Sequence, residues 1–261
     1  MSMIAVENSQ EREILEDAQR ALHDSPTGAR LLALAFEGRV CIAFAEQEED
    51  VWLDGQSMTL SRTRFVESPD AAARAGIFAA LAQGFAQLRH DRAALLKEGL
   101  APSDAVLFEK LCMADRHATA LQVAWEMSKN GDQRAVGGLY LNKPTGAARH
   151  AATVFAEAIQ REGGSLENGR ARRMAAAAFI ARPGVESIRI ERDVLNAAWK
   201  RRGHAPSVSI DRVVRLCFGE AFGHSYLANA KGSLAHLKGM PYRRLRTPGA
   251  AALLSVLEPR R

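Results

Sequence analysis

The amino-acid sequence predicts a predominantly helical α+β protein with one small sheet near its N-terminal end. Apolar residues recur at helical spacing through most of the 261 residues. Only the stretch from Gly38 to Arg64 changes to the two-residue alternation that is typical of strands. A Gly-, Asn- and Pro-rich segment from Gly131 to Gly146 then indicates a domain boundary. We therefore expect an α+β domain over residues 1–140 and an all-helical domain over residues 141–261.

Several of the expected helices begin with a hydroxyl residue directly before a proline, as in Ser25-Pro26, Ser68-Pro69 and Thr247-Pro248. The hydroxyl can accept a hydrogen bond from an otherwise unpaired amide. Proline at the first helical position has no amide to leave unpaired. Together with the apolar periodicity, these starts predict helices over residues 9–23, 26–36, 69–97, 103–129, 146–162, 168–181, 191–202, 208–230 and 248–257.

Three short runs between Gly38 and Arg64 alternate apolar residues with smaller or polar ones. They cover residues 40–44, 51–53 and 58–60, and Asp54-Gly55 supplies a turn between the last two. We therefore expect a small antiparallel sheet of two or three strands. The acidic stretch of residues 46–50 is expected to be a solvated loop.

The composition is typical of a globular protein, with 47% hydrophobic and 25% charged residues. The three cysteines, Cys41, Cys112 and Cys217, lie far apart in apolar surroundings, which favours reduced thiols over disulfides or a zinc cluster. Residues 1–19 lack the pattern of a signal peptide, and no apolar run is long enough to cross a bilayer. We expect a cytoplasmic protein with no membrane partner.

The two halves of the chain carry opposite charge. Residues 1–140 hold 14 Lys and Arg against 21 Asp and Glu, whereas residues 141–261 hold 21 against 9. Such asymmetry indicates a polyanion-binding part, or a basic half that packs against an acidic half. If the second half binds nucleic acid, the candidate residues are Arg172, Arg173, Arg201, Arg202, Arg243 and Arg244. Segments 190–202 and 207–218 are compatible with a helix-turn-helix.

Four short segments carry a resemblance to a known family. They are Ser25-Pro26-Thr27-Gly28, Ala86-Gln87-Leu88-Arg89-His90, Met113-Ala114-Asp115-Arg116 and Trp125-Glu126. With the expected helix and strand order, the chain from Ser25 to Met127 resembles an uncharacterised bacterial family of zincin-like metallopeptidases. In that family the second segment reads like His-Glu-Leu-Arg-His and the third like Glu-Ala-Asp-Ala. The resemblance implies a helix with two zinc-binding histidines, a glutamate base between them, and an acidic ligand on the next helix.

Position by position, the groups that this chemistry needs are missing. Ala86 stands in the slot of the first histidine, Gln87 in that of the base, and Met113 in that of the acidic ligand. A methyl group cannot coordinate a metal, a neutral amide cannot accept a proton near pH 7, and a thioether is a poor zinc ligand. Only His90 remains, with Asp115 nearby. The resemblance therefore implies a retained fold without catalytic zinc, acting by binding a protein or peptide or by regulation.

Two alternatives stay open. The chain could be an active zinc hydrolase with displaced ligands, for which His90, Asp115 and His117, or Glu220, His224 and His236, are the candidate groups. Asp115 and His117 are two residues apart on an expected helix, so their side chains should point in different directions. The other alternative is the nucleic-acid-binding protein described above. No cofactor is expected.

Overall fold

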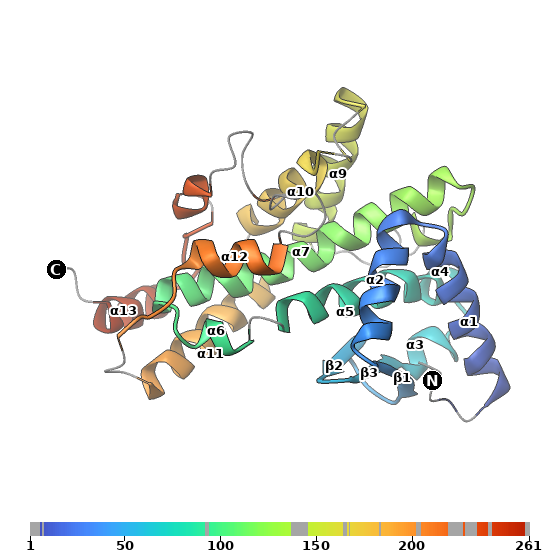
Figure 1. The fold of residues 1–261 in the computed structure, drawn as a ribbon, viewed down its shortest axis with the longest axis horizontal. Coiled ribbons are helices and arrows are strands. Elements are labelled where there is room, and N and C mark those ends of the chain that lie inside the picture. The colour runs from blue at the N-terminus through green and yellow to red at the C-terminus, as the bar shows by residue number, and fades with distance from the viewer. Residues whose placement is uncertain are drawn as a thin grey trace. The chain divides into compact units, whose positions relative to one another are not determined.

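A computed structural model gives the fold (Figure 1). It describes residues 6, 8–91, 94–136, 146–163, 166, 168–182, 184–201, 205–218, 227, 234–239 and 242–258. The described chain is mostly helical and contains one sheet of three strands, which confirms the predicted α+β class. None of the helices in these ranges combines the length and the apolar character needed to cross a membrane.

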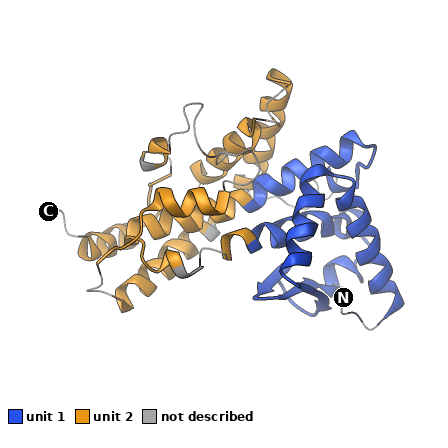
Figure 2. Ribbon diagram, in the orientation of Figure 1, with its two compact units in different colours: residues 1–88, 116–144 blue, residues 89–115, 145–261 orange. Residues whose placement is uncertain are grey.

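The chain divides into two compact units (Figure 2). Unit 1 consists of residues 1–88 and 116–144, and unit 2 of residues 89–115 and 145–261. This division differs from a single boundary near residue 140, because residues 89–115 pack with the helices of the second half. The charge asymmetry persists: unit 2 holds 24 Lys and Arg against 14 Asp and Glu, and unit 1 holds 11 against 16.

Unit 1 begins with a helical hairpin, α1 (Ser9–His23) and α2 (Pro26–Glu37). As predicted, the Ser25 hydroxyl caps α2, accepting a hydrogen bond from the Gly28 amide at 2.9 Å. Gly28 itself permits the tight hairpin, because a Cβ there would lie 2.2 Å from the Leu22 carbonyl oxygen. The remaining elements of unit 1 are β1 (Cys41–Ala45), β2 (Val51–Asp54), β3 (Ser57–Ser61), α3 (Arg62–Phe65), α4 (Ala71–Ala75), most of α5 (Ile77–Asp91) and the second half of α7 (Pro102–Lys129).

The sheet has the order β1-β3-β2 and is mixed, so the prediction of a purely antiparallel sheet is wrong. β2 and β3 form the expected hairpin around Gly55, whose φ is +57°. β1 pairs with β3 in parallel, with Ile42 opposite Met58. The chain reverses once in residues 46–50 and again at the hairpin, so the first strand and the third run in the same direction. Alternation of residues predicts the strands but not which of them become neighbours.

The inner face of the sheet packs against α5. Met58 and Leu60 of β3 share an apolar core with Leu81 and Phe85 of α5. Gly84 allows this close approach, because a Cβ there would lie 2.7 Å from the Met58 Cε. The core also includes residues Ala120, Val123, Ala124 and Met127 of α7.

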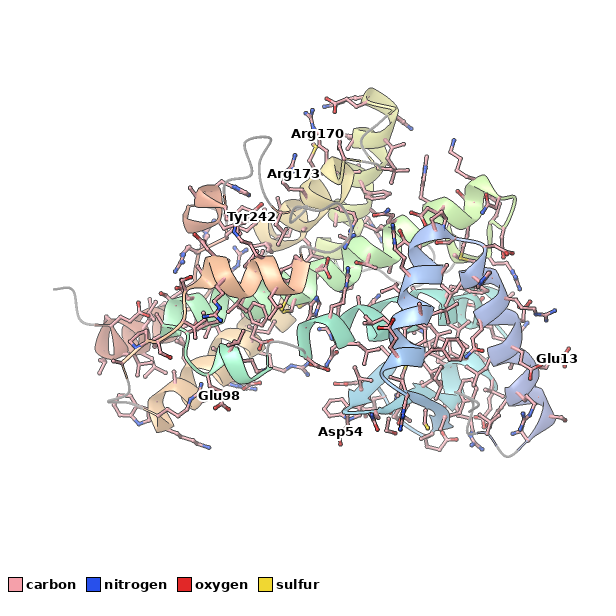
Figure 3. All side chains as sticks on the ribbon, viewed as in Figure 1. Glu13, Asp54, Glu98, Arg170, Arg173 and Tyr242 are labelled. Atoms are coloured by element: carbon pink, nitrogen blue, oxygen red, sulfur yellow. The ribbon has the colours of Figure 1, made fainter. Side chains whose placement is uncertain are left out.

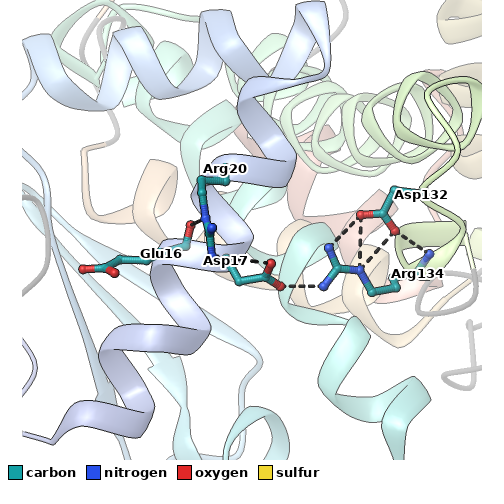
Figure 4. A network of polar contacts seen from close by, with 5 residues as sticks. All are labelled: Glu16, Asp17, Arg20, Asp132 and Arg134. Atoms are coloured by element: carbon teal, nitrogen blue, oxygen red, sulfur yellow. Dashed lines mark hydrogen bonds and ion pairs between the residues drawn. The ribbon is translucent and has the colours of Figure 1, made fainter.

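A network of ion pairs links the turn after α7 to α1 (Figure 4). Arg134 donates through Nη2 to Asp132 Oδ2 at 2.8 Å and pairs through Nη1 with Asp17 of α1. Its guanidinium carbon also lies 5.0 Å from the centre of the Phe78 ring. The contacts with the two carboxylates raise the pKa of Arg134, chiefly through the hydrogen bonds to Asp132, and they hold the turn after α7 in place.

Unit 2 is helical throughout its described residues. It contains α6 (Ala94–Lys97), the first half of α7, α9 (Gly146–Arg161), α10 (Arg170–Ala181), α11 (Val185–Lys200), α12 (Ile210–Phe218), the 3-10 helix η1 (Ala235–Lys238) and α13 (Pro248–Leu257). α9 and α10 pack through alanine-rich faces, and α11 packs against α13 around Leu195 and Ala250. Thr247 caps α13 as predicted, accepting from the Ala250 amide at 3.1 Å.

Several helix boundaries differ from the predictions. The helix expected over residues 69–97 is broken into α4, α5 and α6, and the N-cap of α4 is Asp70 and not Ser68. Asp70 accepts from the Ala72 amide at 2.9 Å, so its carboxylate outcompetes the hydroxyl as the cap. α11 begins at Val185, six residues before the expected start. α12 ends at Phe218, and all but Leu227 of the remaining segment 219–230 lies outside the described residues.

Candidate functional site

The stretch that resembles a zinc-binding motif lies at the end of α5. Ala86 is completely buried in the apolar core of unit 1, so its methyl group serves packing. The next residue, Gln87, accepts a hydrogen bond through Oε1 from Arg116 Nη1 at 2.8 Å. The amide in the slot of the catalytic base therefore holds an arginine of α7.

In unit 2, Asp115 of α7 is the centre of a buried ion cluster. Its Oδ2 lies 2.9 Å from Arg89 Nη2 and 2.9 Å from His90 Nε2, and its Oδ1 lies 2.7 Å from Arg172 Nη2. The cluster, defined as Arg89, His90, Asp115 and Arg172, joins the end of α5 to α7 and α10. Asp115 is fully buried, and Arg172 and His90 are 1% and 5% exposed.

The charges in this cluster fix the state of Asp115. Burial alone would raise its pKa, but the positive charges of Arg89 and Arg172 and the hydrogen bond from His90 outweigh burial. They hold the pKa well below its usual range. Asp115 is therefore ionised, and because a carboxylate can only accept, His90 Nε2 carries the proton that it donates.

His90 is enclosed on other sides as well. Its ring centre lies 5.2 Å from that of Phe218, which in turn lies 6.2 Å from that of Phe108. The Cys217 Sγ is 4.0 Å from the His90 carbonyl oxygen. Phe218 of α12 thus packs against the imidazole, Cys217 contacts the main chain of His90, and His90 is a buried residue of unit 2.

The residues in the motif slots do not fit a zinc ion. Zinc is held by three or four protein ligands, which are Cys sulfur, His nitrogen or Asp and Glu oxygen. Here Ala86 offers no ligand, the buried Met113 offers a thioether, and Asp115 already faces two guanidinium groups. A metal ion bound to Asp115 would also be repelled by Arg89 and Arg172. Within the part of the chain that the structure describes, no three His, Cys, Asp or Glu residues lie close enough together to hold a metal ion.

The displaced ligands considered from the sequence do not assemble among the described residues. His117 is partly exposed, and desolvation together with the nearby charge of Arg116 lowers its pKa to about 4. His236 lies in η1 with its ring centre 5.7 Å from that of Tyr242. Glu220 and His224 lie outside the described residues.

The structure separates the basic residues proposed to bind a polyanion. Arg172 is buried against Asp115, so its predicted role at the surface is wrong. Arg243 is directed to Asp104 and to Ser103 Oγ, the latter at 3.1 Å. Arg173 is partly buried near Tyr242, which is labelled with it in Figure 3. Arg201 and Arg244 are exposed, and Arg202 lies outside the described residues.

A second buried network of hydrogen bonds holds the segment that carries Arg243 and Arg244. The Lys110 ammonium of α7 donates to Glu191 Oε1 of α11 at 2.6 Å and to the Arg244 carbonyl at 2.8 Å. Glu191 Oε2 accepts from the Arg246 amide at 2.8 Å. Burial and the charge of Arg246 lower the pKa of Lys110, against the opposing effect of Glu191. The pairing of Lys110 with Glu191 has no signal in the sequence, since the two residues are far apart in the chain.

In unit 1, the segments Ser25–Gly28 and Trp125-Glu126 meet through Glu126. Its Oε2 accepts from Ser25 Oγ at 2.6 Å and from the Thr27 amide at 2.7 Å, and its Oε1 accepts from Thr27 Oγ1 at 2.7 Å. Gln122 Nε2 donates to the same carboxylate at 2.8 Å. The capping signal at Ser25 was visible in the sequence, but the partner on α7 was not.

On α5 and α7, the polar residues Gln87, His90 and Asp115 are therefore held in contacts with other side chains of the protein. Comparison of the chain with family models, with curated proteins and with solved structures gives no match.

Proposed function

We propose that this chain is a metallopeptidase-like protein that acts by binding a protein or peptide segment and not by zinc hydrolysis. The observation that carries the proposal is the state of Asp115. It is buried between Arg89, Arg172 and His90, in place of the electron-rich ligand set that zinc requires. We therefore expect the binding site to lie on the surface of the protein.

The edge strand β2 supports this proposal in unit 1. β2 pairs with β3 on one side only, and within the described residues no strand pairs with its other side. In this register the main-chain N–H and C=O groups of Val51 and Leu53 point away from β3, toward the open side of β2. The Trp52 side chain on the same strand is 56% exposed. An extended segment could add to this edge through main-chain hydrogen bonds and place an apolar side chain against the indole.

The charge beside β2 specifies the kind of segment. The loop before β2 carries Glu46, Glu48 and Glu49, and the strand ends at the exposed Asp54, labelled in Figure 3. An open hollow of about 540 Å³ borders this loop and is lined by Glu46, Gln47, Glu48, Asp50, Ser61, Thr63 and Arg64. Of these acids, Asp50 pairs with Arg64, and Glu46 accepts from Thr63 Oγ1 at 2.6 Å and lies 4.0 Å from Arg62 Nε. A basic extended peptide matches this edge electrostatically.

The test uses a fluorescent peptide of alternating lysine and valine, with binding followed by anisotropy. Trp52→Ala should weaken binding by about tenfold, as expected for loss of an aromatic anchor. Phe36→Ala is the matched control, because Phe36 is a 54% exposed aromatic of the same unit on α2. The same peptide N-methylated at alternate residues cannot pair with a strand and should bind poorly. No binding by the native protein, or equal losses from both substitutions, would contradict the proposal.

A further inference from the structure

The helix α11 carries an exposed basic stripe in unit 2. Its buried face consists of Ser187, Glu191, Leu195 and Ala198, which recur at helical spacing. The opposite face presents Arg189, Arg192, Asn196 and Lys200, all exposed. At 1.5 Å per residue, the stripe from Arg189 to Lys200 is about 16 Å long.

An exposed aromatic residue borders this stripe. Trp199 precedes Lys200 and is 39% exposed, and Ile188 beside Arg189 is 42% exposed. The stripe includes one acid, Asp193, whose Oδ1 accepts from Arg192 Nε at 2.9 Å. Both side chains of that pair are more than half exposed, so solvent screens it strongly. Arg189 and Asp193 also line a hollow that contains Glu98 and Glu109. Counted on α11 itself, the stripe carries three positive charges against one negative charge, in a unit that is itself basic.

We infer that this face of α11 binds single-stranded nucleic acid. Arg189, Arg192 and Lys200 would contact phosphates along the strand, and Trp199 would stack on a base. A length of about 16 Å accommodates a few nucleotides of an extended strand. The centre of the face is charged and the two apolar side chains lie to one side, which favours a phosphate backbone over insertion into a lipid surface. The indole beside Lys200 can stack on a nucleic-acid base, whereas an acidic peptide has no ring to stack on it.

This inference differs from the nucleic-acid site expected from the sequence. Arg172 and Arg243, two of the predicted contacts, are held by Asp115 and Asp104. None of the residues on the α11 stripe was among the six candidate arginines, although Arg192 and Lys200 lie in the segment 190–202 that was compatible with a helix-turn-helix. The inference concerns residues of unit 2 and not the strand β2 of unit 1. Its test is therefore independent of the test of peptide binding.

The test measures binding of the full chain to a fluorescent 12-nucleotide single strand at several salt concentrations. With three phosphate contacts, log K should fall with log[salt] at a slope of about −2. The triple charge reversal Arg189→Glu, Arg192→Glu, Lys200→Glu should weaken binding by more than about tenfold. The matched control reverses Arg149, Arg161 and Arg170 to Glu, because these exposed residues of α9 and α10 lie in the same unit and give the same change of charge.

Stacking is tested at Trp199. Trp199→Ala should weaken binding by about tenfold, and Trp199→Phe should restore most of it because a phenyl ring also stacks. Ile188→Ala should have little effect. The inference is overturned by the absence of binding at low salt, by equal losses in the two triple variants, or by stronger binding to a polyglutamate peptide of the same length. A shared thermal transition among the variants ensures that loss of binding is not loss of fold.

Discussion

Two carboxylates on the helix α7 show how differently one helix can use the same chemical group. Asp115, in unit 2, is fully buried among charged partners, with two guanidinium groups and one imidazole. Glu126, in unit 1, is held by neutral donors: two hydroxyls, one backbone amide and one side-chain amide. The first carboxylate compensates buried positive charge, whereas the second joins α7 to the start of α2. Neither is available for a metal ion or a reacting substrate.

The largest expected effect comes from removing the carboxylate of Asp115. Asp115→Ala would leave Arg89 and Arg172 as buried cations without their shared anion, which costs about 3–5 kcal/mol of the free energy of unfolding. Urea denaturation measures this loss. Asp193→Ala is the control, since it removes an exposed aspartate of the same unit and should change stability by less than about 0.5 kcal/mol. Comparable losses from both substitutions would show that the cluster does not stabilise unit 2.

A smaller loss is expected at Glu126. Glu126→Ala removes the acceptor for Ser25, Thr27 and Gln122, and hydrogen bonds to a charged group each contribute about 1.5–3 kcal/mol when isolated. Because Ser25 still caps α2 through Gly28 and solvent can replace some contacts, we expect a total loss of about 1–3 kcal/mol. Glu13→Ala on the exposed face of α1 serves as the control. A loss at Glu126 larger than that at Asp115 would reverse the comparison.

The pH dependence of stability separates the groups further. The pKa of His117 falls from 6.5 to about 4 on folding, so the unfolded chain binds its proton more readily. The stability that neutral His117 contributes to the folded state is complete above pH 6.5 and is lost as the pH falls toward 4. Asp115 also has a lowered pKa, so its contribution is complete above its unfolded value of 3.8 and is lost only in stronger acid. His117→Asn should therefore flatten the stability profile between pH 6.5 and 4, while Asp115→Asn should not.

The local parts of the fold were predictable, and the long-range parts were not. Helices α1 and α2 follow apolar periodicity, and the caps at Ser25 and Thr247 follow from a hydroxyl before proline. The bounds of α7 were predicted to within one residue, although its buried residues lie on all sides of the helix. The parallel pairing of β1 was not predictable, because alternation does not reveal which strands become neighbours. The same limit applied to Arg172. As a member of a basic run it was predicted to lie at the surface, but its partner Asp115 is 57 residues away in the sequence.

At the motif slots, the residue types were informative from the sequence but their contacts were not. The residue types at Ala86, Gln87 and Met113 sufficed to argue against zinc chemistry. The structure shows what these positions do: Ala86 packs in the apolar core, Gln87 accepts a hydrogen bond from Arg116, and Asp115 is the centre of an ionic cluster.

The most direct test of this account is the stability of the protein with and without zinc. Urea unfolding of the native protein and of His90→Ala is measured in a chelator and in excess Zn²⁺. A zinc site filled at 100 times its Kd would raise the free energy of unfolding by about 2.7 kcal/mol. We expect the same unfolding midpoint for the native protein in both conditions. A zinc-dependent increase of that size, absent in His90→Ala, would contradict the account in which His90 and Asp115 are held in a buried ionic cluster and bind no zinc.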